Sequence, residues 1–263
     1  MAFDAEQFRA HCREHKPKLG LPLTYQAVTG STNDDALLAA RSGAAHGSVF
    51  LADEQTAGRG RRGNVWHAAA GENLLFSVLL RPELELAQSS ALTLAIGLAL
   101  RDAIAPLIRD RALIKWPNDL LVGGRKLAGV LVESQLQGER LQALVVGVGL
   151  NVASREFPDE IAARATSLAV LGATRLAREP LLYSVLEAIA ARVESYQQSG
   201  VVGLLDELNE ADALRGQRLA VDGQSGVGAG IDGHGHLLLQ DDHGVVHPIL
   251  SGTVELQSHA PPG

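Results

Sequence analysis

The stretch of this sequence best suited to chemistry is residues 58–63, which read Gly-Arg-Gly-Arg-Arg-Gly. Glycine lets the backbone turn sharply and leaves its N–H groups uncovered. Each arginine adds a fixed positive charge and a planar set of donors that suits a phosphate or a carboxylate. Because a packed core does not accommodate three such charges together, we predict that this segment is a loop that binds an anion.

The same six residues also fit G-x-G-x-x-G, the fingerprint of dinucleotide-binding loops. That loop must open directly into the helix of a βαβ unit, whereas a short Gly-broken segment and then a strand-like run at 73–80 follow Gly63. The phosphate-binding pattern G-x-x-x-x-G-K-[ST] does not occur in the sequence. A nicotinamide site is therefore disfavoured, and the simplest alternative to an anion site is a solvated basic turn.

Polar and basic residues elsewhere in the chain are further candidates, although each also has a structural explanation. Ser31 and Asp34 lie three residues apart at the start of an expected helix and fit a capping box. Lys126 follows a Gly-Gly turn at the start of an apolar strand, where a lysine is commonly solvated. Asn118 and Asp119 have the composition of a turn.

Taken together, these motifs resemble those of the biotin protein ligases. The matching motifs are, in order, Ser31-Thr32-Asn33, Glu54-Gln55-Thr56-Ala57 ahead of the arginine loop, Trp66 after it, Lys115-Trp116-Pro117-Asn118-Asp119, Lys126-Leu127-Ala128-Gly129 with the apolar run to Glu133, and Gly147-Val148-Gly149-Leu150-Asn151-Val152. The resemblance runs from about residue 24 to about residue 256. Ordered motifs at matching separations are far more specific than any one of them alone.

The resemblance implies both a fold and a reaction. The fold would be α+β, a mixed sheet with helices of the class II aminoacyl-tRNA synthetase and biotin ligase type, followed by a small SH3-like β-barrel. The enzyme would be a C–N bond-forming ligase that activates biotin with ATP to biotinyl-5′-AMP and releases pyrophosphate. It would then transfer biotin to a lysine of the biotin carboxyl carrier domain of a biotin-dependent carboxylase. Biotin and ATP would be substrates, and Mg²⁺ would neutralise the β- and γ-phosphates.

The resemblance also implies roles for particular residues. The catalytic cations around the α-phosphate would be Arg61, Lys115 and Lys126. Biotin would be bound by Ser31, Thr32, Asn33, Gln55, Gly58, Arg59, Gly60, Arg61, Lys126 and Gly129. ATP and the adenylate would be bound by Arg61, Arg62, Trp66, Asn118 and Asn151, with Asp119 as a Mg²⁺ ligand. Loop 58–63 would order over the adenylate and shield it from water.

The elements that must position these residues can be read from hydrophobic periodicity and turn signals. Strands are expected at 23–28, 48–53, 73–80, 112–116, 119–122, 126–135 and 141–152, and helices at 5–16, 31–41, 90–105, 180–198 and 201–213. The helix at 90–105 is expected to be capped by Ser89 or Ser90. Because tight turns join the last four strands, these strands must pair antiparallel. We therefore predict a mixed sheet and not a doubly wound parallel one.

The composition changes at Arg215-Gly216, beyond which short strands alternate with Gly-rich turns. Strands are expected at 218–221, 227–232, 236–240, 245–249 and 253–257, a pattern typical of a small β-barrel. We predict a catalytic domain at 1–214, a barrel at 215–258 and a flexible tail at 259–263. The barrel's histidines, which are His234, His236, His243 and His247, lack a cysteine or carboxylate at zinc-ligand spacing. They are expected to be solvated.

The bulk composition limits the remaining function classes. The 263 residues carry a net charge of −7, which disfavours a general nucleic-acid binder. The segment before Ser31 is too short for the winged helix-turn-helix of repressor members of the family, so no DNA partner is expected. Cys12 is the single cysteine, the N-terminus lacks a signal-peptide pattern, and the apolar run at 91–100 is too short to span a bilayer. We expect a cytoplasmic protein without a membrane partner.

Two alternative functions remain open. A lipoate or octanoate protein ligase would share the fold, although the arginine loop together with Lys115–Asp119 favours biotin. A non-catalytic module that binds an anion or a nucleic acid is disfavoured by the acidic balance and by an aromatic content of 4%. Members of the family can pair through a sheet edge, so a homodimer is compatible with the sequence, which does not identify that edge.

Overall fold

The computed structural model describes residues 2–174 and 176–257 of the chain. The tail predicted at 259–263 lies outside the described residues. None of the helices in the described part of the chain combines the length and the apolar character that a membrane span requires.

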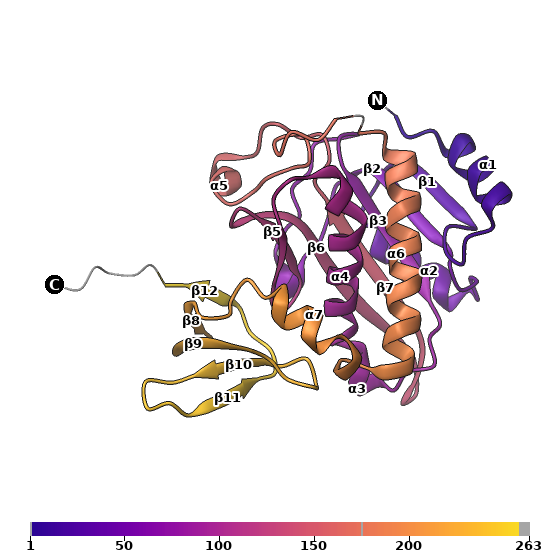
Figure 1. Cartoon of the computed structure of the whole chain (residues 1–263). Coiled ribbons are helices and arrows are strands. Elements are labelled where there is room, and N and C mark those ends of the chain that lie inside the picture. Colours follow the sequence, from indigo (N-terminus) through magenta and orange to yellow (C-terminus); the bar gives the residue numbers. More distant parts are fainter. Residues whose placement is uncertain (1, 175, 258–263) are drawn as a thin grey trace.

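A mixed sheet of seven strands forms the larger part of the molecule (Figure 1). Its order is β1-β2-β3-β7-β6-β5-β4, and its strands are β1 (Leu23–Thr29), β2 (Val49–Gln55), β3 (Leu74–Leu80), β4 (Ala112–Lys115), β5 (Asp119–Val122), β6 (Arg125–Gln137) and β7 (Arg140–Leu150). β1 and β2 pair in parallel, and each of the other neighbouring pairs is antiparallel. The predicted α+β class and the antiparallel run from β4 to β7 are confirmed.

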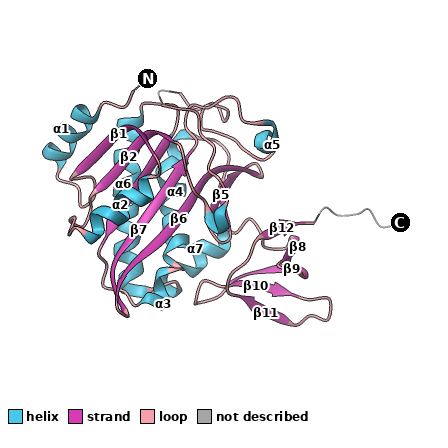
Figure 2. Cartoon of the chain, turned by 180° about the vertical axis from the view of Figure 1, so that it is seen from behind, coloured by secondary structure: helices cyan, strands magenta, loops and turns pink. Residues whose placement is uncertain are grey.

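Helices cover both faces of this sheet, because alternate residues of its central strands are apolar on both sides. On one face α2 (Thr32–Arg41) packs against Phe50, Leu79 and Val145 (Figure 2). On the other face α4 (Leu92–Ile104) and α6 (Arg178–Ser199) lie side by side. They cover the strand residues that lie on the face of the sheet away from α2. β3 is buried over its whole length as a result.

Four further helices complete the described part of the chain. They are α1 (Ala5–His15), α3 (Leu86–Ser89), α5 (Asp159–Ala162) and α7 (Leu205–Glu210), with 3-10 turns at Arg61–Gly63, Ala105–Leu107 and Val202–Leu204. The predicted cap of the helix at 90–105 is wrong, because α4 begins after Ala91 and has no side-chain cap. Ser89 instead closes α3 by donating from its hydroxyl to the carbonyl of Leu86.

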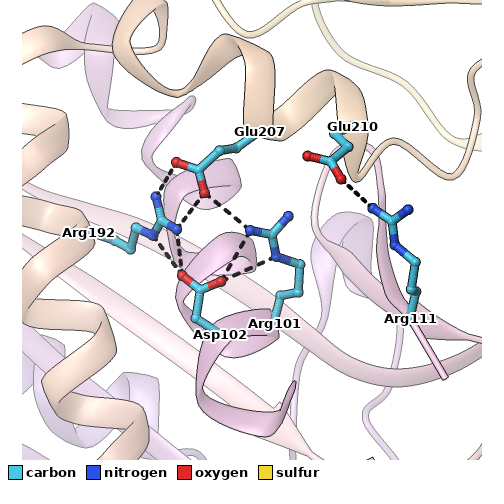
Figure 3. A network of polar contacts seen from close by, with 6 residues as sticks. All are labelled: Arg101, Asp102, Arg111, Arg192, Glu207 and Glu210. Carbon is cyan, nitrogen blue, oxygen red and sulfur yellow. Dashed lines mark hydrogen bonds and ion pairs between the residues drawn. The ribbon is translucent and has the colours of Figure 1, made fainter. Parts of the chain in front are cut away.

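Four charged side chains connect α7 to the two long helices (Figure 3). Arg192 of α6 donates to Asp102 of α4 at 2.5 and 2.9 Å and to Glu207 of α7 at 2.7 and 2.8 Å. Arg101 joins the same two carboxylates, and the more exposed pair Arg111–Glu210 lies beside them. The network attaches α7 to α4 and α6, at the point where the chain passes from the main sheet to the C-terminal strands.

The C-terminal strands form a second, antiparallel sheet of order β11-β10-β9-β8-β12. They are β8 (Arg218–Val221), β9 (Gln224–Ile231), β10 (Leu237–Gln240), β11 (Val246–Ile249) and β12 (Val254–Leu256), as the turn spacing predicted. This arrangement is consistent with the expected SH3-like architecture. The imidazoles of His236 and His247 contact Asp232 and Asp241, and no cluster of three metal-binding side chains occurs in the described residues.

Candidate active site

A pocket of about 170 Å³ lies where the N-terminus of α2, the arginine loop, β6 and β7 meet. The residues predicted for the site that line it are Ser31, Thr32, Asn33, Gln55, Arg59, Gly60, Arg61, Arg62, Trp66, Lys115, Asn118, Asp119, Lys126 and Gly129. Residues that are almost 100 positions apart in the sequence therefore line the same pocket. Gly58 and Asn151 are not part of the lining.

A buried polar network forms the wall contributed by α2. Ser77 of β3 donates its hydroxyl proton to Asn33 Oδ1 at 2.5 Å, and its Oγ also lies 2.7 Å from Thr32 Oγ1. Gln55 Oε1 accepts from the backbone N–H of Thr32 at 2.7 Å. Asn33 lies so close to β7 that a Cβ on Gly147 would come within 2.1 Å of its Oδ1. The network fixes the orientation of these donors and acceptors before any ligand binds.

The predicted capping box at Ser31 and Asp34 is wrong. Ser31 is the N-cap residue of α2 and is buried, but its side chain makes no cap hydrogen bond. Asp34 accepts two hydrogen bonds from Arg59, at 2.6 and 2.8 Å, and so does not complete the box. A charge-assisted, two-point bond to arginine is stronger than a neutral helix cap.

Arg59 is held by carboxylates on two sides. Besides Asp34, Glu133 of β6 lies 3.3 Å from its Nη2, and Glu133 also accepts from Asn33 at 2.6 Å. The hydrogen bonds that Arg59 donates to Asp34 raise the pKa of Arg59 further above its usual value. Arg59 therefore links the loop to α2 and β6. The partner role of Glu133 was missed, because no local pattern distinguishes it from a solvated strand residue.

Arg61, Lys115 and Lys126 bring three positive charges to one side of the pocket, where Asp119 is their acidic neighbour. Lys126 Nζ is 2.7 Å from Asp119 Oδ1. Burial lowers the pKa of Lys115, with Asp119 opposing this effect and Lys126 reinforcing it. Burial also lowers the pKa of Arg61, and Arg62 adds to that shift. Partly desolvated cations that exceed their counter-charge favour the binding of an anion.

Trp66 lies in a slot between the loop and the sheet. Its backbone N–H donates to Gly58 O at 3.0 Å, which gives Gly58 a positioning contact outside the pocket. Its ring covers the cross-strand pair Gly129 and Gly149, where added Cβ atoms would approach ring carbons to 2.9 and 2.3 Å. The indole Nε1 is enclosed and has no hydrogen-bond partner among the described residues, so a donor is available beside the pocket.

The two asparagines predicted for the nucleotide lie in different surroundings. Asn118 lines the pocket, and its Nδ2 donates to Val130 O at 3.0 Å, which ties the 116–118 turn to β6. Asn151 is buried just beyond the end of β7, where its Nδ2 donates to Thr166 O at 3.0 Å. Its role at the nucleotide stays a prediction.

The C-terminal sheet also reaches the pocket, which the sequence did not indicate. Gly252, Thr253 and Val254 are part of its lining. Arg62 donates to Asp222 at 2.8 and 3.0 Å, a contact between residues 160 positions apart in the chain. Side chains this distant in sequence leave no local signal of their contact.

Comparisons with known proteins find relatives of this chain in sequence and in fold. The model of the biotin/lipoate A/B protein ligase family matches residues 25–151. A protein of Bacillus subtilis named bifunctional ligase/repressor BirA is 34% identical over 90% of this chain and 75% of its own length. A biotin–[acetyl-CoA-carboxylase] ligase of Mycobacterium tuberculosis is 38% identical over 81% of both chains. The structure of the biotin protein ligase from Aquifex aeolicus in complex with biotin and ATP superposes with a TM-score of 0.77 at 29% identity, over 90% of this chain and 99% of that one.

Proposed function

The chain belongs to the biotin/lipoate A/B protein ligase family, and we propose that it acts as a biotin protein ligase. It activates biotin with ATP to biotinyl-5′-AMP and then transfers biotin to a lysine of a biotin carboxyl carrier domain. The main observation behind this proposal is that three cationic side chains and a buried polar wall from α2 line the same pocket. The printed names of the relatives, which include biotin–[acetyl-CoA-carboxylase] ligase, support the same reaction.

The chemistry needs positive charge and orientation more than a nucleophile from the protein. A carboxylate oxygen of biotin attacks the α-phosphorus of ATP, the bond to the bridging α–β oxygen breaks, and pyrophosphate leaves. The lysine amine of the carrier then attacks the acyl carbon, loses a proton and expels AMP as the amide forms. Arg61, Lys115 and Lys126 stabilise the charge that develops on the phosphate oxygens.

The polar wall is suited to the head group of biotin. Thr32, Asn33 and Gln55 present donors and acceptors in fixed orientations, as recognition of a cyclic urea requires. Phe76 and Val148 supply apolar surface in the same pocket for the rest of the molecule. Ser31, whose hydroxyl makes no cap bond, completes this wall.

Trp66, Asn118, Arg62 and Asn151 are proposed to surround the adenylate end. The free indole N–H of Trp66 and the place of Asn118 in the pocket lining support this assignment. Asn151 would have to exchange its hydrogen bond with Thr166 to reach a nucleotide. Gly58 is proposed to act through the backbone bond by which it holds Trp66.

Magnesium is proposed to enter with the triphosphate. Asp119 is the carboxylate of the lining, and its Oδ1 is 2.7 Å from Lys126 Nζ. Such a donor set fits an ion that keeps most of its ligands from water and phosphate, as Mg²⁺ does with nucleotides. When bound, the ion would neutralise charge on the β- and γ-phosphates. Asp119 would hold it while Lys126 turns toward the substrate carboxylate or the α-phosphate.

Three further assignments belong to the proposal. The first is the division into a catalytic part at 1–214 and a C-terminal part at 215–258, which the two separate sheets support. The second is a cytoplasmic location, where ATP and carboxylases are available together. The third is that the chain can form a homodimer. Repressor activity, which is named for some relatives, is no part of the proposal.

The deciding experiment is pyrophosphate release from ATP and Mg²⁺ with biotin, lipoate or octanoate as the acid. Biotin-dependent release, followed by labelling of a purified carrier domain, is expected. Turnover with lipoate or octanoate alone would keep the fold and overturn the substrate. Absence of pyrophosphate release with all three acids would overturn the enzymatic function. A carrier domain with its acceptor lysine changed to arginine is the control for the transfer step.

A further inference from the structure

Adjacent arginines of loop 58–63 contact different parts of the molecule. Arg61 is partly buried at the pocket beside Asp119. Arg62 donates from Nη1 to Asp222 Oδ1 at 3.0 Å and from Nη2 to Asp222 Oδ2 at 2.8 Å. This two-point bond crosses from the loop to the turn between β8 and β9 of the C-terminal sheet.

The receiving side of this bond is itself organised. Thr253 Oγ1 accepts from Arg62 Nη1 at 3.3 Å, and the backbone N–H of Thr253 donates to Asp222 Oδ1 at 3.2 Å. Gly252 packs closely against this turn, because an added Cβ would come within 2.3 Å of Val221 Cγ1 and 3.4 Å of Asp222 Oδ2. Since Arg62 and residues 252–254 line the pocket, the bond lies beside it.

Both partners adopt a backbone conformation that residues other than glycine usually avoid. Arg62 has φ 54° and Asp222 has φ 46°. Such residues stay in the left-handed region only where their surroundings hold them there. The bond joins these two turns, so it orients the loop as well as linking charges.

Global stability does not explain this contact. The side chains of Arg62 and Asp222 are 47% and 45% exposed, and exposed ion pairs add little to folding stability. The larger effect of the contact is local. Fixing Arg62 restricts the short Gly-rich loop 58–63, and Arg61 is the residue directly before Arg62. Breaking the contact frees that loop without unfolding either sheet.

We propose that Asp222 is a positioning residue that holds loop 58–63 over the pocket and so slows the escape of the enzyme-bound acyl-adenylate. The inference rests on the proposed ligase function and deepens it. The C-terminal sheet then contributes to the reaction without touching the reacting atoms. Opening of the loop requires Arg62 to leave Asp222.

The test compares Asp222→Asn with a matched control in the same sheet. Asparagine tolerates a positive φ as well as aspartate does, so this change removes the charge and keeps the turn. The control is Asp242→Asn, whose carboxylate accepts two similar bonds, at 2.8 and 3.1 Å, from Arg218 of β8. Circular dichroism melting of both variants shows whether they fold as the parent does.

The readout separates formation of the adenylate from its retention. Enzyme is loaded with biotin and Mg²⁺–ATP, free ligands are removed by rapid gel filtration, and bound biotinyl-adenylate is followed over time. Asp222→Asn is expected to release pyrophosphate in the first turnover like the parent and to lose the adenylate about three- to tenfold faster, the size expected for one charge-assisted contact. Asp242→Asn is expected to retain it like the parent.

Two further measurements test whether Asp222 acts through Arg62. If it does, Arg62→Gln combined with Asp222→Asn loses adenylate no faster than Arg62→Gln alone. Raising the salt from about 50 mM to about 500 mM should speed the loss in the parent and in Asp242→Asn but not in Asp222→Asn, because salt screens an exposed pair.

Parent-like retention in Asp222→Asn would overturn the proposal, and so would additive effects in the double variant. If Asp222→Asn fails to fold, the salt dependence of the parent against Arg62→Gln decides, and equal slopes reject the proposed role of Asp222. Absence of biotin-dependent pyrophosphate release in the parent would instead reject the proposed function on which this inference rests.

Discussion

The ammonium group of Lys126 lies over the ring of Trp66, with Nζ 5.1 Å from the ring centroid, and the same group pairs with Asp119 at 2.7 Å. One cation thus contacts both the aromatic residue that follows the arginine loop and the carboxylate of Asp119. When an anion binds, Lys126 can exchange Asp119 for the ligand while it keeps its contact with the ring.

Lys126→Met should abolish most adenylate formation. The substitution keeps the length of the side chain and removes the charge nearest Asp119, and the loss of one such group costs about 10²- to 10³-fold in rate. Biotin-dependent pyrophosphate release in a single turnover measures this. The control is Lys18→Met, because Lys18 is a 66% exposed lysine that also pairs with a carboxylate. Equal activity of the two variants would contradict the catalytic role of Lys126.

Gly149→Ala should displace Trp66 from its slot. A methyl group there would lie 2.3 Å from the ring, and neither β7 nor the ring can yield that far without moving the loop. We expect a higher KM for ATP and faster loss of the adenylate, with a shift in tryptophan fluorescence. Gly30→Ala, which has open space around its added methyl, is the control. Unchanged fluorescence and KM would show that Trp66 does not depend on the slot.

Lys115 should make the stability of the ligand-free protein rise at alkaline pH. Burial lowers its pKa in the folded state below the ordinary 10.5, so between those two values the unfolded chain binds more protons than the folded one. Stability therefore increases as pH rises through this window, and the increase is complete above 10.5. Urea denaturation at a series of pH values should show a steeper rise for the parent than for Lys115→Met. Parallel curves would exclude Lys115 as the source.

Arg192→Met should destabilise the fold by about 1–3 kcal/mol, since it removes four hydrogen bonds to two carboxylates and leaves only Arg101 between them. The Arg192 side chain is 18% exposed and bonds to Asp102 and Glu207 (Figure 3). Arg111→Met removes the neighbouring bond to Glu210, where both side chains are more than 60% exposed, and should change stability by at most about 0.5 kcal/mol. Urea denaturation measures both, and similar losses would contradict the role of the network.

Much of the scaffold was predictable because its signals are local. Apolar runs bounded by turn signals located the strands of both sheets, and tight turns such as Gly123-Gly124 required β4 to β7 to pair antiparallel. The prediction failed where a side chain bonds to a residue distant in sequence instead of to a sequence neighbour. Asp34 bonds to Arg59 instead of closing a capping box at Ser31, because the arginine offers two charged donors.

The sequence by itself determined where the chain turns, which segments are strands and which residues carry the charge of the site. Those properties depend on residues that are close together in the sequence, so they can be read from the sequence directly. Only the tertiary structure decided that Arg59 bonds to Asp34 and Glu133, that Arg62 bonds to Asp222, and that Gly149 makes room for Trp66. The physical reason is that a side chain takes its partner from those which packing brings within about 3 Å, whatever their separation in sequence.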